Sequence, residues 1–169
     1  MKKNSLLIFL FLITFSTIAI AGNGSAIFPH WRIYSSGGHF TTSSIMVSNI
    51  SDSDATETVI LYDQDGNIFQ DDGSDNTGYI WVDNHDGNYN DNFLGGAVTY
   101  TLSNHSTSDI YIRPDTTIKM QGYGVIKWSS STENIVSLIA IGFENDVQTD
   151  TDTKSKARYS IEINNGMPF

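Results

Sequence analysis

Residues 39–62 read HFTTSSIMVSNISDSDATETVILY, and this stretch carries the clearest structural signal in the chain. In its first half, Ile45, Val47 and Asn49 alternate with Ser44, Met46 and Ser48, so the two sets point to opposite faces of an extended strand. The polar run 51–54 then predicts a turn, and the β-branched run 56–62 predicts a second strand. The stretch therefore predicts two strands, at 39–49 and 56–62, separated by a turn.

The same kind of pattern recurs along the rest of the chain, and no convincing helical period is present after residue 21. Turn residues separate short β-branched or aromatic runs, which is typical of strands. We expect strands at 27–34, 97–102, 109–113, 116–120, 122–128, 136–143 and 157–164, a returning hairpin arm at 67–70 and a short strand at 79–82. So many short strands predict an all-β domain, a single antiparallel β-sandwich of immunoglobulin-like or jelly-roll-like type.

Two motifs carry a resemblance to a known class of domains. The segment SIMVSNIS at 44–51 ends a strand in Asn-x-Ser, and TVILYDQDGN at 58–67 ends a strand in Tyr-Asp-x-x-Gly. Together they resemble the opening hairpin of bacterial immunoglobulin-like sandwich domains, and they are loosely similar to the β-sandwich family of sensory rhodopsin transducer proteins. The resemblance implies a sandwich fold and assigns no functional residue.

The amino terminus has the three parts of a secretory signal. Lys2 and Lys3 precede an apolar run at 6–20, and the run ends in the small-residue box Ala19-Ile20-Ala21. The run is short for a bilayer core of roughly 30 Å, although an uncleaved membrane anchor is the alternative. We predict a signal peptide at 1–21 cleaved after Ala21, a single domain at 22–169 with no membrane span, and a secreted or periplasmic location of bacterial type.

Composition limits the function classes. The net charge is −10 with no cysteine, so a disulfide framework is excluded and a nucleic-acid partner is not expected. No Lys or Arg occurs between Ile33 and Ile112, whereas the last third holds most of the basic residues. Solvated acidic loops would explain this asymmetry. A cation site or electrostatic self-association of acidic and basic parts, giving a homo-oligomer, would also explain it.

Acidic residues within 63–91 make calcium the metal to consider, although no cofactor is required by any motif. Calcium prefers six to eight oxygen ligands, which closely spaced carboxylates and amides supply. The spacing does not match an EF-hand loop, and a hairpin turn is the favoured interpretation of Asp65-Gly66. The predicted ligands are Asp71, Asp72, Asp75, Asp83, Asp86 and Asp91.

Aromatic residues within or beside the Asp- and Asn-rich segment predict a glycan- or protein-binding surface. Tyr79, Trp81 and Tyr89 could stack on sugar rings while Asp and Asn bind the hydroxyls. The alternative is that large aromatics fill the core, which we favour for Trp31 and Trp128.

No catalytic constellation is visible: cysteine is absent, no Gly-x-Ser-x-Gly elbow occurs, and the four histidines show no zinc-pair spacing. Whether the protein is an enzyme therefore stays uncertain, with a non-enzymatic role favoured. The leading hypothesis is a secreted or periplasmic binding or surface-interaction protein that engages a glycan or a protein through residues 71–92. The alternative is a structural or assembly subunit pairing through edge strands, with 159–164 as the candidate edge, and a small secreted hydrolase comes third.

Overall fold

The computed structural model describes residues 22–70, 80–84, 88–90, 97–114, 118–130, 138–149 and 154–169. For residues 80–84, 88–90 and 154 it describes the backbone alone. The signal peptide predicted at 1–21 lies outside the described residues. Within the described ranges, no helix has the length and apolar character needed to cross a membrane.

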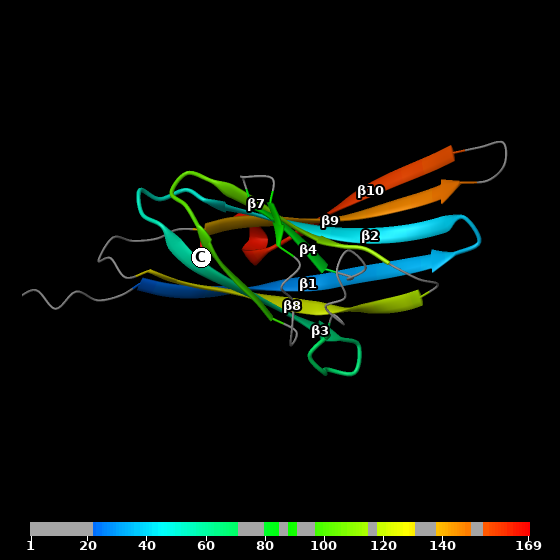
Figure 1. Cartoon of the computed structure of the whole chain (residues 1–169), viewed down its shortest axis with the longest axis horizontal. Coiled ribbons are helices and arrows are strands. Elements are labelled where there is room, and N and C mark those ends of the chain that lie inside the picture. Colours follow the sequence, from blue (N-terminus) through cyan, green and yellow to red (C-terminus); the bar gives the residue numbers. More distant parts are fainter. Residues whose placement is uncertain are drawn as a thin grey trace, which may run out of the picture.

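Ten strands account for most of the described chain, which confirms the all-β prediction (Figure 1). A single turn of 3₁₀ helix at Asn164–Gly166 is the only helix in the described ranges. The strands are β1 (Gly22–Ser36), β2 (His39–Asn49), β3 (Ala55–Asp63), β4 (Ile80–Asn84), β5 (Asn88–Asn90), β6 (Ala97–Leu102), β7 (Thr107–Ile112), β8 (Ile118–Ser130), β9 (Leu138–Thr149) and β10 (Lys154–Glu162).

The strands form one antiparallel sheet that branches at β2 and does not close. Eight strands follow the order β5-β4-β7-β2-β1-β8-β3-β6, and β9 pairs with β2 and carries β10 at its outer edge. One edge of β2 pairs with β1 through residues 39–41 and with β7 through residues 43–48. The opposite edge pairs with β9 along the whole strand. β1 and β7 therefore pair with different parts of the same edge of β2 and then diverge. β1 leads to β8, β3 and β6, which form one arm of the sheet. β7 leads to β4 and β5, which belong with β2 to the other arm.

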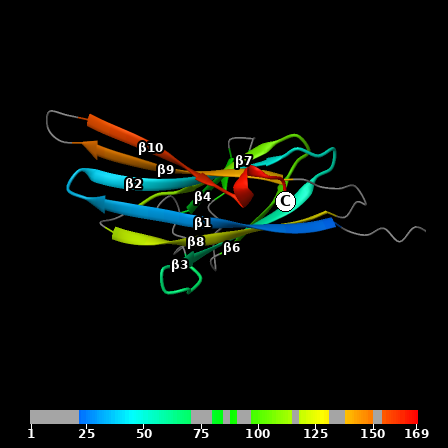
Figure 2. The same cartoon turned by 180° about the vertical axis from the view of Figure 1, so that it is seen from behind.

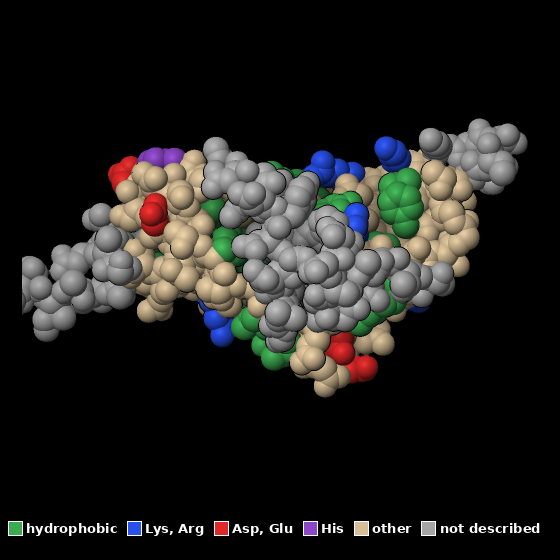
Figure 3. Space-filling model, in the orientation of Figure 1, with side chains coloured by type: hydrophobic (Ala, Val, Ile, Leu, Met, Phe, Trp, Pro, Cys, Tyr) green, Lys and Arg blue, Asp and Glu red, His purple; other side chains and the backbone are tan. Residues whose placement is uncertain are grey.

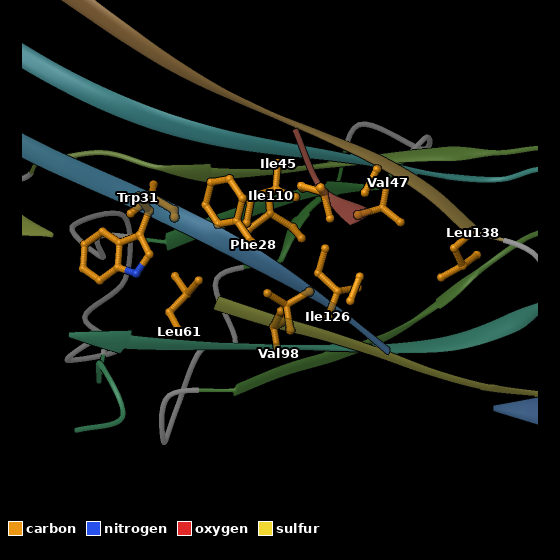
Figure 4. Packing of buried hydrophobic residues seen from close by; sticks show 14 of the residues in the cluster. Phe28, Trp31, Ile45, Val47, Leu61, Val98, Ile110, Ile126 and Leu138 are labelled. Atoms are coloured by element: carbon orange, nitrogen blue, oxygen red, sulfur yellow. The ribbon is translucent and has the colours of Figure 1, made fainter. Parts of the chain in front are cut away.

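Figure 2 shows the two arms of the sheet from behind, and the hydrophobic core lies between them (Figure 4). Ile45 and Ile110 come from the arm of β2 and β7, whereas Phe28, Leu61 and Ile126 come from the arm of β1, β3 and β8. All five side chains are completely buried. Full burial of one such side chain stabilises the fold by about 1.5–3 kcal/mol, so contacts between the arms hold the branched sheet in shape.

Trp31 and Trp128 are buried, which confirms that they belong to the core. Trp31 follows an irregularity in β1 between Phe28 and Trp31, where the pairing with β8 shifts. Its indole N–H donates to the carbonyl oxygens of Tyr62 and Tyr123, at 3.1 Å each. The buried ring nitrogen therefore has partners, and the tryptophan joins β1 to both β3 and β8.

The sequence predictions of strand extent were wrong in several places. The strands predicted at 116–120 and 122–128 form the single strand β8, because Gly122 fits within an extended strand beside Tyr62, where a Cβ would lie 1.8 Å from a carbonyl oxygen. The arm predicted at 67–70 amounts to one bridge between Tyr62 and Ile68. In addition, β5 forms at Asn88–Asn90, where no strand is predicted, because pairing with β4 outweighs the low β-propensity of Asn.

Candidate functional site

A groove of about 310 Å³ opens beside the point where β1, β2 and β7 meet. This volume lies at the lower end of the range for small-molecule binding clefts, about 300–1,000 Å³. The groove is lined by Ser35, Phe40, Thr42, Tyr111, Arg113 and Pro114. The register places Ser35 opposite Phe40 across the β1–β2 hairpin, so both flank one mouth of the groove.

The floor of the groove is polar and fixed by hydrogen bonds. The Tyr111 hydroxyl donates to Thr42 Oγ1 at 3.2 Å, and Asn145 Nδ2 from β9 donates to the same oxygen at 3.4 Å. Thr42 is buried, so its hydroxyl position is set by these two neighbours rather than by solvent. Hydrogen-bonded side chains of this kind keep a binding surface preorganised.

Apolar surface stands beside this polar floor. Phe40 remains 37% exposed, which is unusual for phenylalanine and leaves part of its surface available to a ligand. Pro114 and the ring of Tyr111 add further apolar surface, and Arg113 adds a guanidinium. An aromatic surface with a few placed polar groups is the usual composition of a ligand site.

A cation–π pair extends the same face of the sheet toward β10. The Arg158 guanidinium carbon lies 3.9 Å from the centre of the Phe143 ring. Asn145 stands opposite Thr42 on one side and opposite Arg158 on the other, so the three residues form a row across β2, β9 and β10. In Figure 3, Lys and Arg side chains lie close to hydrophobic ones at the upper right, in the region of β9 and β10.

The opposite face of β2 and β9 carries a charged cluster in which the carboxylates pair with basic side chains. Glu144 Oε1 accepts from Arg32 at 2.7 Å, and Glu144 Oε2 lies 3.3 Å from His30 Nε2. Asp146 contacts His39 and accepts from the hydroxyl of Thr41. Because the carboxylates already have partners from β1 and β2, this cluster is best explained as a set of ties between neighbouring strands.

A carboxyl group without a hydrogen-bond partner lies in the core. Glu57 is completely buried on β3, and neither of its carboxyl oxygens meets a donor. Burial raises the pKa of Glu57 to about 8, an effect that the nearby Tyr100 hydroxyl partly offsets. The Tyr100 hydroxyl forms a hydrogen bond with Ser108 Oγ at 2.7 Å. Its geometry toward Glu57 falls short of a hydrogen bond. Burial, followed by the charge of Glu57, raises the pKa of Tyr100 in turn.

Most of the residues predicted as ligands fall where the structure gives no description. Those outside the described residues are Tyr79, Asp71, Asp72, Asp75, Asp86 and Asp91. Trp81, Asp83 and Tyr89 are described by their backbone alone. Within the described ranges, no group of three or more His, Asp or Glu side chains could hold a metal ion. The calcium prediction therefore stays a prediction.

The register nevertheless brings two of the predicted positions close to the groove. Trp81 of β4 stands opposite Tyr111 of β7, and Tyr111 lines the groove. Asp83 stands opposite Tyr89 on one side and opposite Asp109 on the other. The aromatic position predicted for a ligand and the observed groove therefore belong to adjacent strands of one sheet.

The acidic turn at 63–67 is fully explained by local structure. Asp63 Oδ1 accepts from the backbone N–H groups of Asp65 and Asn67, at 2.9 and 2.8 Å. Desolvation acts to raise the pKa of Asp63, but these hydrogen bonds outweigh it and the pKa is lowered. Gly66 adopts a φ of +81°, as a tight turn requires. The carboxylate therefore shapes the turn, in agreement with the hairpin-turn interpretation.

Sequence reasoning missed the groove residues because they are far apart along the chain. Phe40 and Thr42 lie in β2, Tyr111 lies in β7, and Asn145 lies in β9. The one available signal was the placement of Phe40 and Thr42 on a single face of a strand by the two-residue period. No family model, no curated protein and no solved structure matches the chain.

Proposed function

We propose that the protein is a non-enzymatic, extracytoplasmic binding protein that holds a glycan in the groove between β2 and β7. The observation that carries this proposal is the groove itself, where Phe40 and Tyr111 offer aromatic surface around the fixed Thr42 hydroxyl. The location follows from the predicted signal peptide at 1–21. We also propose that the two-armed sheet is the antiparallel β-sandwich that the sequence predicts.

A carbohydrate fits this chemistry because sugar rings present both kinds of surface. Their C–H faces pack against aromatic side chains, and their hydroxyls exchange hydrogen bonds with hydroxyl and amide groups. The groove offers hydroxyls from Ser35, Thr42 and Tyr111. The backbone register places Trp81 of β4 opposite Tyr111, on the strand next to the groove.

Affinity electrophoresis through gels that contain soluble polysaccharides tests this proposal. We expect retardation of the purified protein by at least one polysaccharide. The Phe40→Ala and Tyr111→Ala variants should migrate without retardation. Tyr159→Ala is the matched control, because Tyr159 is 56% exposed and stands opposite Glu144, on the other face of β9. Equal loss in all three variants, or retardation by no polysaccharide in a broad panel, would contradict the proposal.

Assembly through an edge strand is the second candidate function. Among the described strands, β10 pairs with β9 alone, so one side of the carboxyl-terminal strand supports this candidate as an edge. The strand spans Lys154–Glu162 rather than 159–164, since Ile163 is buried and a 3₁₀ turn follows. A nine-residue edge can accept a strand from a neighbouring copy. Molar mass by light scattering over a hundredfold concentration range decides: a constant monomer mass excludes this candidate.

A further inference from the structure

We propose that the groove selects glycans that carry carboxylate groups, so that its ligand is a polyuronide. This inference rests on the proposed function and names the substrate class for the same site. It starts from a contrast in charge: the chain has a net charge of −10, yet Arg113 lines the groove and Lys156 and Arg158 stand nearby on β10.

Strand alternation separates the charges of this region onto two faces. On β9, Glu144 and Asp146 point to one face, where they engage Arg32 and His39. Phe143 and Asn145 alternate with them and therefore face the groove side. On β10, Arg158 stands opposite Asn145 and shares this second face.

Among the side chains that the structure describes, the acidic residues on the groove side of β7 and β10 lie farther along the strands. Glu162 of β10 is four residues beyond Arg158, and Asp109 of β7 is two residues beyond Tyr111, on the side away from Arg113. The basic end of this face therefore coincides with the groove. A negatively charged ligand is attracted there despite the negative net charge, because exposed charges act mainly within a Debye length of about 8–10 Å.

The geometry of Arg158 suits a carboxylate in particular. Its guanidinium carbon lies 3.9 Å from the centre of the Phe143 ring, so the cation–π contact holds the group beside this face of the sheet. A planar guanidinium binds a carboxylate through two parallel hydrogen bonds, which a lysine cannot do. In register, Arg158 is two strands from Thr42, or about 10 Å at the usual strand spacing. A ligand longer than one sugar can therefore reach both the groove and Arg158.

Binding of polygalacturonate and of its fully methyl-esterified form tests the inference, with retardation in affinity electrophoresis as the readout. The two polymers share one sugar backbone and differ in charge. We expect the acid form to bind at least about tenfold more tightly, as the loss of a charge-assisted hydrogen bond implies. Arg158→Gln should weaken binding of the acid form by about tenfold and leave the ester unchanged. Lys127→Gln is the matched control, because Lys127 lies on β8, in the other arm of the sheet.

The outcomes separate this inference from the proposed function. Equal binding of the acid and ester forms would overturn the charge selection and leave glycan binding intact. Equal binding of polyglutamate and polygalacturonate would overturn the sugar preference, since polyglutamate supplies carboxylates alone. Binding of neither the acid nor the ester form, or of the acid form by the wild type and Arg158→Gln alike, would also overturn the inference.

Discussion

At the scale of single residues, Glu57 places a carboxyl group without a hydrogen-bond partner in the core. It shares the buried face of β3 with Ala55 and Val59, so alternation alone places its carboxyl group inside. An ionised carboxylate without a hydrogen-bond partner is strongly disfavoured there, which is why burial raises its pKa to about 8. The folded protein therefore keeps Glu57 protonated over a pH range in which the unfolded chain does not.

This shift predicts a pH-dependent stability. The unfolded chain releases the Glu57 proton near the ordinary pKa of 4.5, whereas the folded state holds it until about pH 8. Between these values the folded state binds more protons. The free energy of unfolding should therefore fall by about 1.4 kcal/mol per pH unit as pH rises through this window. Glu57→Gln should remove this slope and stabilise the protein above pH 8.

Urea unfolding at pH 5, 7 and 9 measures the effect. Glu162→Gln is the control, because Glu162 is an exposed carboxylate on β10 and its replacement should leave the slope unchanged. A wild-type stability that is flat or rises between pH 5 and 8 would contradict the assignment of a protonated Glu57.

Gly142 is a second residue whose identity is explained by its surroundings. The reason is close packing of neighbouring side chains and not a backbone conformation that favours glycine. A Cβ at Gly142 would lie 2.2 Å from Cε2 of Phe28, whose ring is completely buried. We expect Gly142→Ala to destabilise the fold by about 1–3 kcal/mol, as overpacking does. The Phe28→Leu change should partly relieve this collision, so the double variant should lose less stability than the sum of the two single variants. Additive losses in thermal unfolding would show that the two sites do not interact.

At the scale of elements, the two-residue hairpin Gly37-Gly38 positions the groove, since it sets the β1–β2 register that brings Ser35 opposite Phe40. Both glycines have positive φ, +57° and +83°, as the favoured hairpin turns require. Gly38 also joins the hairpin to β9, because its carbonyl oxygen accepts from the backbone N–H and the hydroxyl of Thr149.

The two glycines should respond differently to the same substitution. A Cβ at Gly38 would lie 2.5 Å from the carbonyl oxygen of Thr149, whereas a Cβ at Gly37 would meet nothing within 4 Å. Asparagine tolerates positive φ, so Gly37→Asn should change stability by less than about 0.5 kcal/mol. Gly38→Asn should cost about 1–3 kcal/mol because of the collision. Equal effects of the two variants in urea unfolding would contradict this account of the hairpin.

At the scale of the whole molecule, the predicted calcium ligands remain to be tested, because they lie almost entirely outside the described residues. If Asp71, Asp72, Asp75, Asp83, Asp86 and Asp91 bind calcium in the folded state alone, millimolar calcium should raise Tm and a chelator should reverse the rise. Thermal unfolding with calcium, with magnesium and with chelator measures this. An unchanged Tm would contradict the calcium prediction and favour the alternative, in which the acidic residues between 71 and 91 are solvated.

The sequence by itself determined most of the strands, because the two-residue period and the turn residues are local features. Phe40 to Asn49 and Ala97 to Leu102 lie in strands as their patterns predict, and β10 lies at an edge. Only the tertiary structure decided the branch at β2, which depends on how β1 and β7 share one edge of that strand. The tertiary structure also decided the groove, because Thr42, Tyr111 and Asn145 meet through long-range strand pairing that no local pattern encodes.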